Sequence, residues 1–362
     1  MRNLLRISFI FFLALGLVSV NQAQDKSTRA EFECLMMSNT SAVAAPGDQA
    51  RFASYHHVWV PGLSYGTFES NGLNFTYEME GSGSETVVVV HGGAGLPHEY
   101  FHPMLSNLGR YARMIYFDRR ADMRSTKSIY DMASLDEMAE DVDALRKSLG
   151  LNRVTLFGHS FGGAIALTYA LRYPEHVKRL ILVSTAATIE KPSEAEKRIV
   201  NQLTPKELAA YNSNEGDSGG RTICQRVLKR YRVLYPHYFH KQPSKELLDG
   251  GVYSVYFDAL AKKIVLADRG GFDVRAALDQ IKVPVIVFGG RHDLVTPVSQ
   301  FNELAEGLPR SRAVIMEHSA HFPFYEESYL FTEWVRQFMA ATNDMVNDKA
   351  GTGTVTTSDD SR

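Results

Sequence analysis

The chain has 362 residues, of which 44% are hydrophobic and 22% are charged, and its formal net charge at pH 7 is -2. Such a chain can bury a substantial hydrophobic core, and its near-neutral charge argues against nucleic acid or an acidic membrane surface as the main partner. We therefore expect a globular protein whose partner is a small molecule or a short peptide.

The N-terminal segment has the pattern of an export signal. Arg2 and Arg6 provide a positive start, a short apolar run follows, and Ala23 provides a cleavage position. The run is short for a membrane-spanning helix, although a retained anchor is the alternative because Asn21 stands where a small residue is usual. We predict that residues 1–23 are a signal peptide and that the protein is exported, periplasmic or secreted, without stable membrane insertion after signal removal.

Two further segments carry no recognisable chemistry. Residues 24–55 are polar and rich in small residues, and residues 343–362 have a similar character. We expect the first to be a leader segment outside the folded domain and the second to be a disordered tail. Export would permit a disulfide between the two cysteines, Cys34 and Cys224, but their positions do not require one.

Apolar runs of strand length recur along the chain and alternate with helical patterns. Residues 87–90 are four consecutive valines, which is typical of a strand buried on both faces of a sheet. The same pattern recurs at residues 115–117, 154–157, 180–183, 285–288 and 313–316. Asn71-Gly72 marks a hairpin before the first run, and Ser134 with Glu137 forms a helix capping box. The alternation predicts an α/β fold with a doubly wound, mostly parallel sheet.

The alternation is interrupted between residues 186 and 271. This stretch lacks valine-rich strands and is polar and helical, with Thr204, Pro205 and Glu207 placed to begin one helix. We predict a helical cap (lid) domain at 186–271, inserted into a core formed by 56–185 and 272–342. An additional subdomain that faces solvent is the alternative.

The residues Gly158-His159-Ser160-Phe161-Gly162 connect an apolar strand to a helix rich in small residues. A G-x-S-x-G sequence in that setting is typical of a nucleophile elbow, a tight turn that exposes the serine hydroxyl. The pentapeptide alone is weak evidence because chance can produce it. In this context it predicts Ser160 as the nucleophile.

A serine nucleophile needs a base, and the base needs an acid that orients it. In hydrolases with this elbow the acid follows the nucleophile in the sequence and the histidine comes last, each just after a strand. Asp293 and His321 satisfy both conditions. The local rivals are Asp279, which precedes its strand, and His318, which lies three residues before His321.

The glycine-rich stretch His91-Gly92-Gly93-Ala94-Gly95 follows the valine strand directly. Glycines let the backbone approach a substrate closely, and backbone amides commonly stabilise an oxyanion. We assign this role to the amides of Gly93 and Phe161. The stretch lacks the lysine and the serine or threonine of a phosphate-binding loop, so that alternative does not fit. We expect the reaction to need no cofactor and no metal.

One competing motif is His98-Glu99-Tyr100-Phe101-His102, which matches the zinc-peptidase pattern H-E-x-x-H. Such a site needs both histidines one turn apart on a continuous helix. Pro103 disfavours helical geometry at His102, and no third ligand is evident in the sequence. We therefore expect the motif to pack at a helix start rather than to bind metal.

Five motifs occur in a fixed order along the chain: His91-Gly92-Gly93-Ala94-Gly95, Phe117-Asp118-Arg119-Arg120, Gly158-His159-Ser160-Phe161-Gly162-Gly163, Gly290-Arg291-His292-Asp293 and His321-Phe322-Pro323. Together they resemble the proline iminopeptidase branch of the α/β-hydrolases. Two departures bear on the substrate pocket, because the family usually has proline at Ala94 and two glycines within the stretch Ala121-Asp122-Met123.

This resemblance implies an α/β-hydrolase fold with a cap and a metal-independent serine hydrolase that forms an acyl-enzyme. Its most specific implication is an aminopeptidase that releases N-terminal proline or similar residues from short peptides. Peptidases of this branch bind the substrate's amino group with acidic cap residues, and the sequence does not rank the candidates, Glu194, Glu196, Glu207, Glu215 and Glu246. The alternatives are a hydrolase of small carboxylesters or lactones and a non-catalytic ligand-binding relative.

Overall fold

The computed structural model describes residues 63–93, 98–119, 134–189, 192–213, 230, 232–243 and 271–343. Several sequence-based predictions lie outside these residues: the signal peptide, the leader segment, nearly all of the predicted tail, both cysteines, Ala94, Ala121–Met123, Glu215 and Glu246. The chain divides into two compact units, Met1–His57 with Thr204–Val233, and Val58–Leu203 with Leu234–Arg362.

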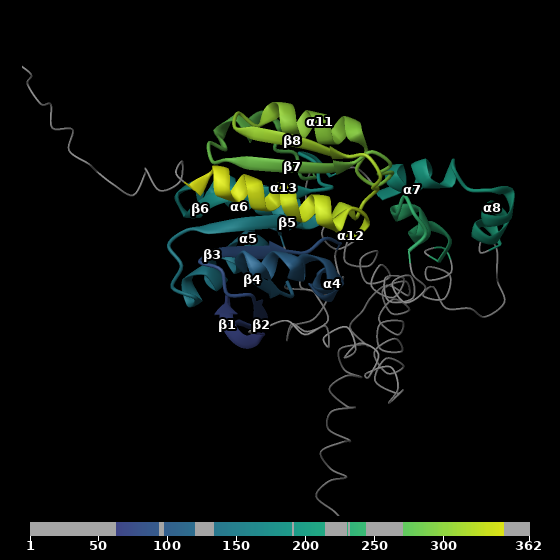
Figure 1. Cartoon of the computed structure of the whole chain (residues 1–362). Helices are drawn as coiled ribbons and strands as arrows, with labels where there is room; N and C mark the ends of the chain where they lie inside the picture. The colour runs from purple at the N-terminus through teal and green to yellow at the C-terminus, as the bar shows by residue number, and fades with distance from the viewer. Residues whose placement is uncertain are drawn as a thin grey trace, which may run out of the picture. The chain divides into compact units, whose positions relative to one another are not determined.

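The second unit contains an eight-stranded sheet with the order β1-β2-β4-β3-β5-β6-β7-β8 (Figure 1). Its strands are β1 (Ser64–Ser70), β2 (Leu73–Glu80), β3 (Glu85–Val90), β4 (Ala112–Phe117), β5 (Val154–His159), β6 (Val177–Val183), β7 (Val285–Gly290) and β8 (Ser311–Met316). β2 pairs antiparallel with β1 and β4, and all other pairs are parallel. The predicted mostly parallel sheet is confirmed.

The β1–β2 hairpin and the central strands form where local sequence predicts them. Asn71 and Gly72 both have positive φ angles, 49° and 72°, as a two-residue hairpin turn of this type requires. The four valines of β3 are at most 1% exposed. Each buried valine side chain stabilises the fold by roughly 1.5–3 kcal/mol.

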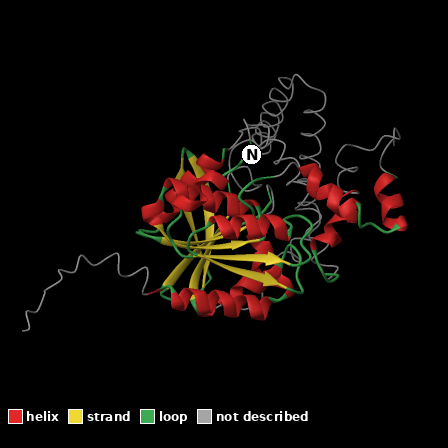
Figure 2. Ribbon diagram, turned by 90° about the horizontal axis from the view of Figure 1, so that it is seen from above, coloured by secondary structure: helices red, strands yellow, loops and turns green. Residues whose placement is uncertain are grey.

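Helices lie on both faces of the sheet (Figure 2). On one face, α5 (Leu135–Ser148), α6 (Phe161–Arg172) and α11 (Val298–Gly307) contribute to the main hydrophobic core. On the other, Phe331 of α13 (Ser328–Ala341) contacts Phe157 and Phe288. Because side chains alternate along a strand, β5 sends Leu156 into the first layer and Phe157 into the second.

The remaining described helices of the second unit are short. They are η1 (His98–Phe101), α4 (His102–Leu105), η2 (Ser106–Arg110), η3 (Pro174–His176), α7 (Pro192–Val200), η4 (Tyr235–Tyr238), η5 (Arg275–Gln280) and α12 (Pro323–Glu326). In the first unit, α8 (Pro205–Asn212) begins with Thr204 as N-cap and Glu207 as its capping-box partner, as predicted. The capping box of Ser134 and Glu137 is also confirmed. The extent of the cap domain stays a prediction.

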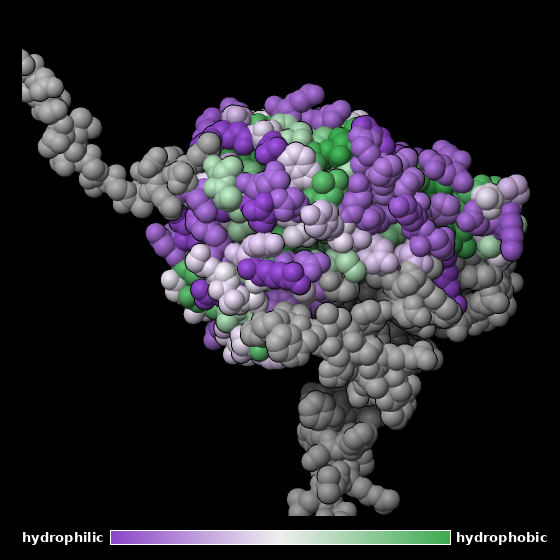
Figure 3. All heavy atoms as spheres, viewed as in Figure 1, coloured by the Kyte–Doolittle hydropathy of each residue, from purple (hydrophilic) through white to green (hydrophobic). Residues whose placement is uncertain are grey.

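The face seen in Figure 3 is mainly hydrophilic where its residues are described, with smaller apolar areas between the polar ones. Among the described residues, no helix has both the length and the apolar character needed to cross a membrane.

Candidate active site

Ser160 lies in a tight turn between β5 and α6, with φ 51° and ψ -120°. A non-glycine residue rarely adopts this backbone conformation, so the surrounding structure must hold it in place. The Ser160 amide donates to Val183 O at 2.9 Å, and the Thr185 hydroxyl donates to Ser160 O at 2.7 Å. Gly162 allows the turn to pack closely, because a Cβ at this position would overlap Val90 O. The geometry is that of the predicted nucleophile elbow.

Asp293 follows β7 and His321 follows β8, and the two side chains meet. The Nδ1 atom of His321 is 2.9 Å from Oδ2 of Asp293, and both residues are buried. The other carboxylate oxygen, Oδ1, accepts hydrogen bonds from the amides of Val295 and Thr296 at 2.8 and 2.9 Å. These bonds orient the carboxylate toward His321.

The two sequence rivals are placed differently. His318 is exposed, and its backbone amide donates to Glu327. Asp279 is exposed in η5, before β7 begins. Neither side chain takes part in the buried contact between Asp293 and His321.

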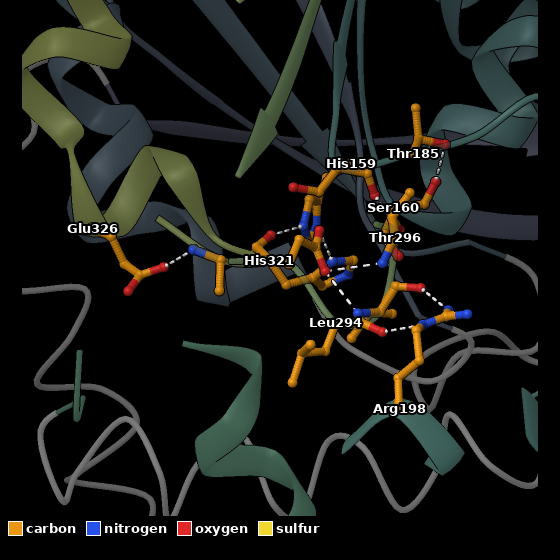
Figure 4. Close-up of polar contacts among 12 residues, drawn as sticks. His159, Ser160, Thr185, Arg198, Leu294, Thr296, His321 and Glu326 are labelled. Atoms are coloured by element: carbon orange, nitrogen blue, oxygen red, sulfur yellow. Dashed lines mark hydrogen bonds and ion pairs between the residues drawn. The ribbon is translucent and has the colours of Figure 1, made fainter. Parts of the chain in front are cut away.

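Figure 4 shows the Thr185 hydroxyl bonded to the backbone oxygen of Ser160, and His159, the residue before Ser160, beside His321. The imidazole rings of His159 and His321 are 5.0 Å apart, which places the elbow next to the histidine loop. Within the described residues, the Ser160 hydroxyl makes no hydrogen bond. Catalytic hydrogen bonds are often long without substrate, so the serine–histidine contact stays a prediction.

His159 and Tyr100 form a hydrogen-bonded connection that the sequence did not reveal. The Gly92 amide donates to Tyr100 Oη at 2.7 Å, and Tyr100 Oη lies 2.7 Å from His159 Nδ1. His159 Nε2 lies 2.9 Å from the carbonyl oxygen of His321. Burial and the nearby His321 lower the pKa of His159 well below 6.5, so the ring is neutral at pH 7.

This neutral ring has one consistent arrangement of protons. A carbonyl oxygen can only accept, so His159 Nε2 carries the hydrogen and donates to His321 O. Nδ1 then accepts from the Tyr100 hydroxyl, which itself accepts from the Gly92 amide. His159 lies within the elbow motif, but its partners come from two distant segments that no local pattern identifies.

The glycine loop lies directly against the elbow. A Cβ on Gly92 would be only 3.0 Å from Ser160 Cβ, so the approach requires glycine. The Gly92 amide is already bonded to Tyr100, whereas the Gly93 amide has no hydrogen bond among the described residues. The Phe161 amide is the first of α6, where helix geometry provides no intrahelical acceptor. Gly93 and Phe161 are therefore suited to the predicted oxyanion role.

Arg119 binds the start of the glycine loop. This fully buried side chain donates to the carbonyl oxygens of Gly92 and Gly93. Its guanidinium also lies 5.2 Å from the centre of the Phe161 ring. Arg119 therefore contacts both segments that carry the predicted oxyanion amides.

The loop that holds Asp293 is anchored by α7. Arg198, which Figure 4 shows beside Leu294, donates to the carbonyl oxygens of Leu294 and Val295 at 2.8 and 2.9 Å. The loop that holds His321 is anchored by Glu326, which accepts from the Ala320 amide at 2.7 Å. Both loops are thus fixed by contacts outside their own strands.

Glu207 and Glu194, two of the acidic cap candidates, have contacts within their own helices. Glu207 accepts from the amide and hydroxyl of Thr204, so its carboxylate caps α8. Glu194 pairs with Lys197 at 2.8 Å on the surface of α7. These contacts do not identify the group that would hold a substrate's amino group.

His98 and His102 stand at the starts of η1 and α4, where the sequence predicted that they pack, and the structure adds a residue to this cluster. Pro103 lies in the first turn of α4, where proline is tolerated, and the two imidazole rings are 5.5 Å apart. Glu78 of β2 contacts both, so a third potential ligand is present. It was missed because 20 residues separate it from His98 and only the fold brings them together.

Comparison with known proteins agrees with this architecture. Residues 85–211 match the family model described as the alpha/beta hydrolase fold. A proline iminopeptidase of Saccharolobus solfataricus is 26% identical over 315 residues, which cover 79% of this chain and 96% of the relative.

Two solved structures share the fold. A membrane phospholipase A, described as a bacterial virulence factor, has a TM-score of 0.67 at 23% identity and covers 86% of this chain and 97% of its own. A proline iminopeptidase of Mycobacterium smegmatis has a TM-score of 0.63 at 21% identity, and the match covers 78% of this chain and 99% of that protein. The chain therefore has the α/β-hydrolase fold. In sequence it resembles the proline iminopeptidases.

Proposed function

We propose that the chain is a serine hydrolase in which Ser160 is the nucleophile, His321 the base and Asp293 the residue that orients the base. The observation that carries the proposal is the 2.9 Å contact between His321 Nδ1 and Asp293 Oδ2, on a loop next to the strained elbow of Ser160. The contact fixes the Nδ1–H tautomer, which leaves Nε2 able to accept a proton.

In the proposed reaction, Ser160 Oγ attacks the substrate carbonyl carbon while its proton passes to His321 Nε2. The Gly93 and Phe161 amides stabilise the negative charge that develops on the carbonyl oxygen. The imidazolium then gives its proton to the departing amine or alcohol as the acyl-enzyme forms. Water, activated by the same histidine, attacks the ester carbonyl and releases Ser160.

The substrate we propose is a short peptide with proline or a similar residue at its N-terminus. Support comes from the sequence similarity to proline iminopeptidases, which extends over 96% of the length of the Saccharolobus solfataricus protein. The solved α/β-hydrolases with more distant sequences share only the fold, so they do not distinguish peptide from ester substrates.

A panel of substrates tests this choice. Turnover of proline arylamides should exceed turnover of short acyl esters and lactones when compared by kcat/KM. Rapid ester hydrolysis without arylamide cleavage would contradict the peptidase proposal and support the ester hydrolase. Absence of turnover on every substrate, by protein with native circular dichroism, would support a non-catalytic ligand-binding protein.

We also propose that the protein is exported, on the basis of the signal-like pattern in residues 1–23. Expression of the full chain in a bacterium should yield mature protein that begins at Gln24 and is found outside the cytoplasm. Intact mass spectrometry and N-terminal sequencing measure this directly. Full-length protein retained in the membrane fraction would instead indicate an uncleaved anchor.

A further inference from the structure

Three buried side chains outside the proposed catalytic machinery meet at the outer part of the sheet. Glu78 lies on β2, His98 begins η1 and His102 begins α4. One potential ligand atom from each residue lies within 4.8 Å of the other two. Two imidazoles and one carboxylate are a common ligand set for zinc.

The distances between these atoms suit a common metal ion. Glu78 Oε2 is 3.3 Å from His98 Nε2 and 3.1 Å from His102 Nε2. Ligands held about 2.0–2.1 Å from a tetrahedral Zn²⁺ lie roughly 3.3–3.4 Å from one another. Glu78 Oε2 and His98 Nε2 are both buried, yet their contact lacks hydrogen-bond geometry. Both atoms therefore keep a lone pair that a metal ion could accept.

In both histidines Nε2 faces Glu78, and the other ring nitrogen, Nδ1, lies near a second carboxylate. His98 Nδ1 is 2.8 Å from Asp118 Oδ1, and His102 Nδ1 is 3.5 Å from Glu80 Oε2. Glu80 in turn accepts a hydrogen bond from the Tyr116 hydroxyl at 2.5 Å. In metal sites, such outer carboxylates fix the histidine tautomer and orient Nε2 toward the ion.

This region needs positive charge, which either protonated His98 and His102 or a bound cation can supply. Glu78, Glu80 and Asp118 are three buried carboxylates arranged around two imidazoles. Burial of carboxylates is strongly unfavourable unless their charge is compensated. A divalent cation would compensate two of the three negative charges while both histidines stay neutral.

We propose that Glu78, His98 and His102 bind a divalent transition metal ion, for which Zn²⁺ is the best match in ligand type and spacing. A cavity of about 380 Å³, lined by residues of β1 and β2, reaches Glu78 and His98 and provides an access route. The ion would tie β2 to η1, where Tyr100 binds the Gly92 amide. Its role is therefore structural, because it positions the glycine loop without contacting substrate.

Metal titration of the mature protein tests the site. The protein is first freed of metal with a chelator and dialysed. After Zn²⁺ is added, mass spectrometry of the metal content should find one Zn²⁺ bound per chain. Co²⁺ in place of Zn²⁺ should produce the visible absorption of a tetrahedral site. A free Zn²⁺ concentration of about one hundred times the Kd should raise the melting temperature by roughly 5–10 °C.

Variants identify the ligands. His98→Ala and Glu78→Gln should each abolish the Zn²⁺-dependent rise in melting temperature, and Asp118→Asn should weaken binding roughly 10–100-fold. The matched control, His176→Ala in η3, should bind like the wild type. A wild-type protein that binds no Zn²⁺, or undiminished binding by both ligand variants, would overturn the proposal. If the ligand variants do not fold, the wild-type titration alone decides, and it does so independently of any hydrolase assay.

Discussion

The backbone carbonyl of His321 accepts a hydrogen bond from Nε2 of His159, at 2.9 Å. Through Tyr100 the same ring is connected to the Gly92 amide. The loop that carries the proposed base and the loop that carries a proposed oxyanion amide are therefore linked by one neutral imidazole. The arrangement depends on the protonation state of His159, which leads to the first two predictions.

Tyr100→Phe should destabilise the protein while its packing stays intact. The change removes the donor to His159 Nδ1 and the acceptor of the Gly92 amide. A buried polar group without a partner costs about 1–3 kcal/mol, so the free energy of unfolding should fall by about that amount. Urea unfolding measures it. Tyr329→Phe is the control because this tyrosine is 85% exposed. Equal stability of both variants would contradict the proposed link.

His159 should make the protein less stable in mild acid. Its pKa in the folded state is well below 6.5, so below about pH 6.5 the unfolded state binds more protons than the folded state. The stability that a neutral His159 provides is fully present above this pH. It is lost as the pH falls, by up to about 1.4 kcal/mol per pH unit.

The variant His159→Gln isolates this contribution, because glutamine does not titrate. Urea unfolding at about pH 7.5 and pH 5.5 should show a smaller acid-induced loss of stability for the variant than for the wild type. An identical loss in both proteins would mean that His159 does not titrate as its burial requires.

Asp293→Asn should abolish most of the activity without unfolding the protein. Asparagine keeps the shape of the side chain but cannot stabilise the imidazolium of His321, and its amide group favours the wrong tautomer. In serine proteases the equivalent change lowers kcat by about 10⁴-fold, and we expect a loss of that order. Asp279→Asn is the matched control and should retain full activity. Similar kinetics for the two variants would contradict the assignment of the acid.

Arg198→Ala should loosen the loop that holds Asp293. The variant loses the hydrogen bonds to the carbonyl oxygens of Leu294 and Val295. We expect a stability loss of about 1–3 kcal/mol and a decrease in kcat, since the carboxylate is then less firmly oriented. The neighbouring variant Lys197→Ala removes only an exposed ion pair and should change stability by less than about 1 kcal/mol. A normal kcat in Arg198→Ala would show that α7 does not position the acid.

Local sequence patterns were sufficient for the sheet and for the strand ends that carry the proposed site residues. The four valines of β3 fit only a strand covered on both faces, and Asn71-Gly72 fits a tight hairpin turn. The elbow at Ser160 and the pairing of Asp293 with His321 follow from strand-end placement in a parallel sheet. The turn and the strands depend on a few neighbouring residues, and the Asp293–His321 pair, 28 residues apart, was predictable because each residue follows its own strand.

The contacts that sequence did not predict join distant segments. Glu78 occupies the polar face of an amphipathic strand, where a carboxylate ordinarily faces water, but η1 and α4 bury it. Tyr100 of η1 meets His159 of β5 although 59 residues separate them in the sequence. His159 donates to a backbone carbonyl oxygen. Because every residue has such an oxygen, the sequence does not identify this partner. These contacts depend on tertiary packing and not on local propensity.

The central claim is that Ser160 is the nucleophile, and covalent labelling tests it most directly. Mature protein treated with a fluorophosphonate should gain the mass of one label, and peptide mapping should place the label on Ser160. Ser160→Ala should remain unlabelled, whereas Ser148→Ala, which changes a serine in α5, should be labelled like the wild type. Folded wild-type protein that takes no label, or a label mapped to another residue, would contradict the proposed mechanism.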